Sequence, residues 1–72
     1  MSLPERLVSL RESRGFNKSQ VAHGIGASPI GYCRYEYGER VPAYKQLIAL
    51  ADFYNVSMDY IAGRTDNPQI VR

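Results

Sequence analysis

Apolar residues recur every three or four positions in several short stretches of the chain, a spacing that places them on one face of an α-helix. Glycine, asparagine and proline residues separate these stretches, and none shows the alternation typical of a β-strand. The pattern therefore predicts an all-α chain of five short helices. The predicted core faces are Leu3, Leu7 and Leu10 in the first helix, Val21, Ala22 and Ile25 in the second, Leu47, Leu50, Ala51 and Tyr54 in the fourth, and Val56 with Ile61 around the fifth.

Capping residues mark where these helices begin. Ser2 with Glu5, and Asn17 with Gln20, have the three-residue spacing of a capping box. Ser28 can cap a third helix. The proline that follows it suits the first helical position, because the N–H that proline lacks would be unbonded there in any case. The first helix is expected to run from Ser2 to Gly15, the second from Asn17 to Gly26, the third over residues 29–37, the fourth over residues 44–54, and the fifth from Ser57 to Gly63.

The length and composition allow one small domain. A chain of 72 residues with 44% hydrophobic and 22% charged residues can build a single core and is too apolar to be disordered. The net charge is only +2, but four basic and two acidic residues lie between positions 17 and 45, whereas three aspartates accompany two arginines from position 46 onward. Positive charge therefore concentrates in the middle of the chain, which favours nucleic-acid binding there.

The middle stretch, residues 17–38, is typical of two short helices joined by a tight turn. Gly26 can take the left-handed backbone conformation that such a turn needs, and the helix at 29–37 is expected to face outward. This helix-turn-helix pattern and the segments around it resemble the phage-repressor (XRE-like) family of DNA-binding domains. The segments are RYE at 34–36, GER at 38–40 and SMDYIAGRTD at 57–66, and the similarity extends over about Leu3 to Asp66.

The resemblance implies both an architecture and a function. It implies a compact five-helix repressor-like domain over residues 1–66, with the helix-turn-helix formed by the second and third helices and a C-terminal tail at 67–72. It implies sequence-specific binding of double-stranded DNA by a small transcriptional regulator, a repressor that occludes a promoter, with the recognition helix 29–37 in the major groove. It also pairs Arg11 with Glu36 as a structural ion pair between the first and third helices.

A homodimer on an inverted repeat is expected, because one small module buries little surface on DNA. Pairing two recognition helices about 34 Å apart doubles the contact. The expected dimer surface is the fifth helix and the tail, with Tyr60, Ile70 and Val71 as candidates.

Phosphate contacts are expected at the start of the second helix and around the loop that follows the third. The backbone amides there face outward with the positive end of the helix dipole, and Lys18 adds a charge. The family usually has glutamine at this position, so a lysine is expected to bind a phosphate with less directionality and more salt dependence. The alternative for each candidate is a solvated surface side chain. The candidates are Asn17, Lys18, Tyr37, Arg40, Tyr44 and Lys45.

Few side chains on the predicted recognition helix can read bases. Family members commonly have Gln, Arg, Ser or Thr at the positions of Pro29, Ile30 and Gly31, none of which offers a side-chain hydrogen bond. The base contacts that remain are Ser28 at the N-cap and an apolar contact from Pro29 or Ile30 to a thymine methyl. Arg34, one turn beyond Ile30, can bridge O6 and N7 of guanine. Its alternative role is a phosphate contact or an ion pair with a neighbouring glutamate.

The tyrosines favour a second hypothesis. Tyr32, interpreted as a bulky core residue whose hydroxyl reaches solvent, crowds the outward helix together with Tyr35 and Tyr37. Tyrosine-rich apolar surfaces are common in protein interfaces. The alternative function is therefore a protein–protein interaction module, such as an antirepressor, on a repressor-like fold that no longer reads bases. DNA binding should weaken steeply as salt rises, whereas contact with a protein partner should change little.

Other classes of function have little support in the sequence. His23 and Cys33 are the only residues of their kinds and lie on different predicted helices, with no acidic cluster at ligand spacing. We therefore expect no enzymatic activity, no metal and no cofactor. Cys33 is interpreted as a small helical residue, with redox sensing as its alternative if the sulfur is exposed. One cysteine and the lack of a membrane span or signal peptide fit a cytoplasmic protein.

Overall fold

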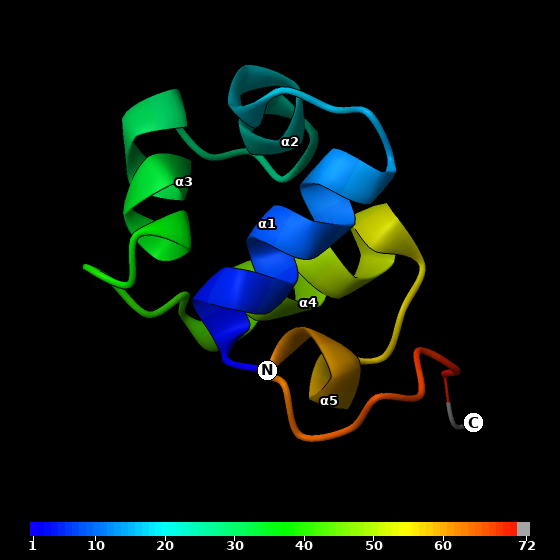
Figure 1. Ribbon diagram of the computed structural model, residues 1–72. Helices are drawn as coiled ribbons and strands as arrows, with labels where there is room; N and C mark the ends of the chain where they lie inside the picture. The colour runs from blue at the N-terminus through cyan, green and yellow to red at the C-terminus, as the bar shows by residue number, and fades with distance from the viewer. Residues whose placement is uncertain (71–72) are drawn as a thin grey trace.

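The computed structural model describes residues 1–70 and contains five α-helices joined by short loops (Figure 1). The predicted all-α architecture is confirmed, and residues 1–70 contain no strand. No helix among these residues has the length and apolar character needed to cross a bilayer. The helices are α1 (Leu3–Ser13), α2 (Lys18–Gly24), α3 (Pro29–Glu36), α4 (Tyr44–Tyr54) and α5 (Met58–Ile61).

Side-chain caps begin four of the five helices, as predicted from the sequence. Ser2, Asn17, Ser28 and Ser57 each accept a hydrogen bond from the backbone N–H three residues later. Each cap of this kind contributes about 1 kcal/mol, because it satisfies an N–H that the helix itself leaves unbonded. The exception is α4, which begins after Ala43 without a side-chain cap. Its stability therefore depends on the apolar face that it buries.

One hydrophobic core joins all five helices. In Figure 1, α1 crosses in front of α4, α2 and α3 lie to one side, and α5 lies below. The predicted core faces are confirmed, except that Leu3 and Leu47 are only partly buried at the edge. The largest fully buried side chains are Tyr32, Tyr54, Leu7, Leu50, Ile61 and Val21.

Two tyrosine hydroxyls lie inside this core. The Tyr32 side chain is fully buried, so the expectation that its hydroxyl reaches solvent is wrong. The hydroxyls of Tyr32 and Tyr54 are both buried, and neither has a hydrogen-bond partner among residues 1–70. Desolvation raises the pKa of both phenols, because a buried phenolate would lose its hydration. Both tyrosines therefore remain neutral throughout the physiological pH range.

Arg6 ties the end of the described chain to α1, a role that the sequence did not reveal. Its guanidinium lies 3.8 Å from the centre of the Tyr60 ring, and Nη2 donates to the Thr65 carbonyl at 3.2 Å and to Asp66 Oδ1 at 3.1 Å. The backbone N–H of Ser57 also donates to the Pro68 carbonyl at 3.0 Å. The segment that follows α5 therefore contacts α1 through Thr65 and Asp66 and the start of α5 through Pro68.

Candidate nucleic-acid interface

The turn between α2 and α3 sets the position of the recognition helix. Gly26 adopts a φ of +72°, which an L side chain rarely takes, and the Ala27 N–H donates to the Ala22 carbonyl at 2.9 Å to close the turn. Val21 and Ala22 are fully buried. The first helix of the motif is therefore anchored in the core, and the second leaves it from a closed turn (Figure 1).

One face of α3 is buried and the opposite face is free. Tyr32, Tyr35 and Glu36 are the buried residues of this helix. Four predicted base-contact residues lie on its exposed part, and the most apolar of them, Ile30, has 70% of its surface exposed. The structure therefore places Ser28, Pro29, Ile30 and Arg34 together on the outward side of one helix.

The burial of Tyr35 removes part of the tyrosine-rich surface on which the protein-binding hypothesis rested. Tyr35 is only 6% exposed and packs edge-on against Tyr32, with ring centroids 6.4 Å apart. Of the three tyrosines expected to crowd the outward helix, only Tyr37 is exposed, at the C-cap of α3 rather than within it. Aromatic residues in a helix without a clear apolar period can face either way, which is why the sequence did not reveal this burial.

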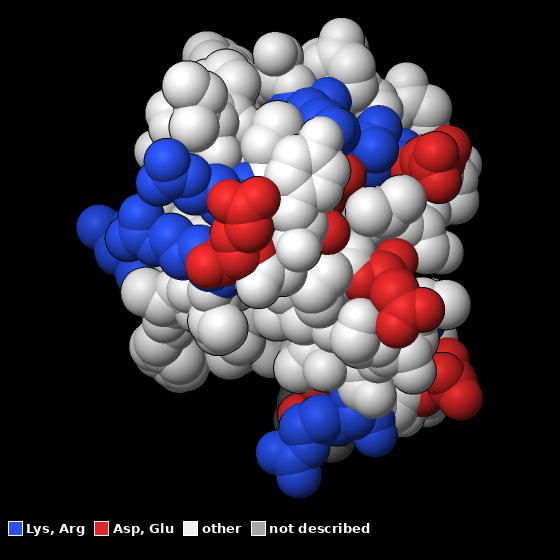
Figure 2. Space-filling model, turned by 60° about the vertical axis from the view of Figure 1, so that its left-hand side comes forward, with Lys and Arg blue, Asp and Glu red and all other residues white. Residues whose placement is uncertain are grey.

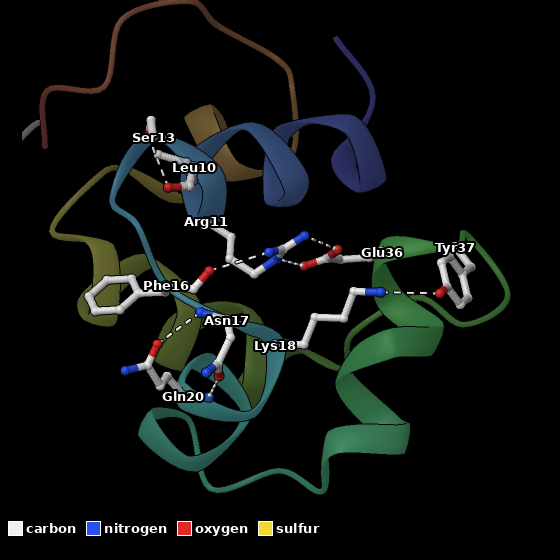
Figure 3. Close-up of polar contacts among 9 residues, drawn as sticks. All are labelled: Leu10, Arg11, Ser13, Phe16, Asn17, Lys18, Gln20, Glu36 and Tyr37. Carbon is white, nitrogen blue, oxygen red and sulfur yellow. Dashed lines mark hydrogen bonds and ion pairs between the residues drawn. The ribbon is translucent and has the colours of Figure 1, made fainter.

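An ion pair fixes the inner end of α3 (Figure 3). Arg11 on α1 donates from Nε to Glu36 Oε2 at 2.7 Å and from Nη2 to Oε1 at 3.2 Å. Its Nη1 also donates to the Phe16 carbonyl at 3.3 Å, just before α2. The hydrogen bond to Glu36 raises the pKa of Arg11, so the guanidinium is always charged. Arg11 therefore links α1, the segment before α2 and the C-terminal end of α3.

Lys18 and Tyr37 meet at the outer edge of the same motif (Figure 3). The Lys18 Nζ donates to the Tyr37 hydroxyl at 3.1 Å and lies 4.8 Å from the centre of its ring. This hydrogen bond raises the pKa of the Lys18 ammonium. The contact joins the start of α2 to the end of α3 and brings two of the predicted phosphate contacts together.

The remaining predicted phosphate contacts lie on the loop after α3 and at the start of α4. Arg40, Tyr44 and Lys45 are all exposed. Figure 2 shows a group of basic side chains at the left edge of the α3 side of the molecule, with one acidic group directly beside it and further acidic side chains toward the right. Within residues 1–70, neither Arg34 nor Arg40 forms an ion pair, so the ion-pair alternative for Arg34 is not seen. Asn17 is also exposed, and its side-chain oxygen is occupied by the Gln20 N–H.

α5 and the tail, which carry the described dimer candidates Tyr60 and Ile70, lie away from α3 (Figure 1). Tyr60 is half-buried beneath Arg6, Ile70 is 40% exposed, and Val71 lies outside the described residues. A groove of about 610 Å³ between α4, α5 and the tail includes Ile48, Met58 and Ile70. This side therefore offers apolar surface at the residues where dimer contacts were expected.

Cys33 and His23 are not part of a metal-binding cluster. Among residues 1–70, no group of three or more His, Cys, Asp or Glu side chains is arranged to hold a metal ion. Cys33 is half-buried on α3, and His23 is exposed at the end of α2.

Comparison with known proteins places the chain in a helix-turn-helix family. Residues 7–61 match the family described as Helix-turn-helix. The chain is 39% identical over 64 residues to the uncharacterized HTH-type transcriptional regulator YobD of Bacillus subtilis, covering 89% of this chain and 57% of YobD. It is 37% identical over 71 residues to the cryptic phage CTXphi transcriptional repressor RstR of Vibrio cholerae, covering 96% of this chain and 63% of RstR. The chain thus spans less than two thirds of the length of these two relatives.

The fold of the chain matches the solved structures of other proteins. A transcriptional regulator from Listeria innocua superimposes with a TM-score of 0.83 at 27% identity, covering 99% of this chain and 64% of that one. The P22 c2 repressor, solved in complex with a synthetic operator, superimposes with a TM-score of 0.81, covering 85% of this chain and 92% of that one. At 23% identity, the second match is evidence for the fold alone.

Proposed function

The chain belongs to the helix-turn-helix (XRE-like) family that includes phage repressors, and from this membership we propose that it is a transcriptional repressor that binds double-stranded DNA. In this proposal α3 lies in the major groove, and the exposed residues at its start contact base edges. The main support for this proposal is that α3 has one buried face and one exposed face. Its inner face is buried and fastened through Glu36, whereas Ile30 and Arg34 face outward. A cytoplasmic location follows, because the regulator must meet its DNA.

Each part of the outward surface has a role in this proposal. Arg34 reads guanine through its two-pronged guanidinium, Ile30 and Pro29 contact thymine methyl groups, and the Ser28 hydroxyl contacts a base edge. These contacts specify the sequence, and phosphate contacts position the protein. The residues proposed to contact phosphates are Asn17, Lys18, Tyr37, Arg40, Tyr44 and Lys45.

A pair of charge-matched variants tests whether α3 is the DNA-binding surface. Ile30→Glu and Ser13→Glu each add one negative charge at an exposed position, the first on α3 and the second at the end of α1, away from α3 (Figure 3) and outside α5 and the tail. A carboxylate at position 30 would face the phosphates and bases, so we expect Ile30→Glu to weaken binding to duplex DNA by more than tenfold, whereas Ser13→Glu changes it by less than threefold. Fluorescence anisotropy with a labelled duplex measures both affinities. Equal effects would place the contact elsewhere.

We also propose a homodimer on an inverted repeat, with α5 and the tail at the interface. The partly exposed apolar residues Tyr60 and Ile70 on the side away from α3 support this assignment. Deleting residues 69–72, which include Ile70 and Val71, is expected to shift the protein from dimer to monomer in sedimentation equilibrium. The deletion preserves the Ser57–Pro68 hydrogen bond, so the fold should persist. A truncated protein that remains a dimer would remove Ile70 and Val71 from the interface.

A further inference from the structure

The contact between Lys18 and Tyr37 joins two residues that are 19 positions apart in the chain. A lysine side chain is a flexible four-carbon stem that normally leaves its charge free to move. Here the ammonium is held at 3.1 Å from the hydroxyl oxygen and 4.8 Å from the ring centre. The hydroxyl therefore restricts where the positive charge of Lys18 lies relative to α3.

The chemistry of the pair leaves donors available for an anion. The Tyr37 oxygen accepts from Lys18, which leaves the O–H of the tyrosine free to donate. The ammonium has three N–H donors, and only one is used by Tyr37. The neighbouring carboxylate of Glu36 does not compete, because both of its oxygens are bonded to Arg11. Tyr37 is 65% exposed, so an incoming phosphate can reach the pair.

We propose that Tyr37 is a positioning residue for Lys18 and that the two side chains bind one DNA phosphate as a unit. The inference rests on the proposed DNA-binding function and adds to it that the two contacts depend on each other. In the unit, a phosphate oxygen accepts from the tyrosine O–H and from a free ammonium N–H at the junction of α2 and α3. Charge-assisted hydrogen bonds from a held ammonium are stronger and more directional than the attraction of a mobile one.

A double-mutant cycle tests this dependence with a mixed-sequence DNA duplex as the probe. Tyr37→Phe removes the hydroxyl and is expected to weaken binding about fivefold, the effect of one hydrogen bond. Lys18→Met is expected to weaken binding tenfold or more and to lower the steepness of the salt dependence. If the pair acts as a unit, Tyr37→Phe has little further effect in the Lys18→Met background.

Tyr44→Phe is the matched control, because Tyr44 is also largely exposed on the proposed DNA side, at 72% against 65% for Tyr37, and makes no hydrogen bond to Lys18. Its effect should be the same with and without Lys18. Thermal unfolding of the Phe variants should match that of the wild type, which separates positioning from folding. Additive effects of Lys18→Met and Tyr37→Phe would overturn the inference while leaving DNA binding intact. A wild-type protein that binds no duplex at low salt would overturn the proposed function and the inference together.

Discussion

Arg11→Met is expected to lower the free energy of unfolding by about 3–5 kcal/mol at 25 °C. The substitution strands the Glu36 carboxylate, whose side chain is only 2% exposed, without its partner. Removing one member of a buried ion pair costs about 3–5 kcal/mol, because the remaining charge is desolvated and uncompensated. A domain of this size has a free energy of unfolding of roughly 4–11 kcal/mol. Urea denaturation followed by circular dichroism measures the loss.

Two further variants test whether the loss of stability comes from the broken ion pair or from the loss of a positive charge in general. Arg64→Met removes the same charge from an exposed position and should change the free energy of unfolding by less than about 0.5 kcal/mol. Arg11→Met combined with Glu36→Leu should recover much of the stability, since no unpaired charge stays buried. An Arg11→Met protein with the denaturation midpoint of the wild type would show that the pair contributes little.

DNA affinity is expected to fall about a thousandfold when salt rises from about 50 to about 200 mM. Each phosphate neutralised by a cation releases counterions, so log K falls with log salt at a slope of about −0.9 per contact. Lys18, Arg40 and Lys45 provide six such contacts in a dimer, which gives a slope near −5. A monomer with three contacts would lose only about fortyfold over the same range. Anisotropy titrations at several salt concentrations therefore measure both the mode of binding and the number of protomers.

A slope near zero would contradict this prediction and favour protein contact over DNA contact. The control is Lys45→Met, which should make the slope less steep by about one unit for each protomer.

The helices were predictable because their signals are local. Capping residues lie three positions from the N–H groups that they bind. The fourth helix was expected over residues 44–54, and α4 ends at Tyr54 because Asn55 takes a left-handed backbone conformation. The apolar faces were predictable for the same reason, since the helical period depends only on neighbouring positions. The pairing of Arg11 with Glu36 came from the family resemblance, because nothing in their spacing indicates that they meet.

Long-range contacts of polar side chains were not predictable from the pattern. Arg6 was not among the residues that the sequence pattern singled out, because its partners Thr65 and Asp66 are 59 and 60 positions away. Lys18 was expected to bind a phosphate with less directionality than a glutamine, and the hydroxyl that holds it belongs to Tyr37 at the C-cap of α3. These contacts depend on how the helices pack, which sequence periodicity does not encode.

Selection of bound sequences from a random DNA library, with the wild type and Arg34→Ala in parallel, tests the central claim most directly. Recognition of bases by α3 predicts that the wild type enriches an inverted repeat and that Arg34→Ala loses preference at one guanine in each half-site. One guanidinium–guanine pair contributes about 1–3 kcal/mol of discrimination, so the loss should be at least fivefold. Salt-sensitive binding by the wild type without any enriched sequence would contradict base reading by α3.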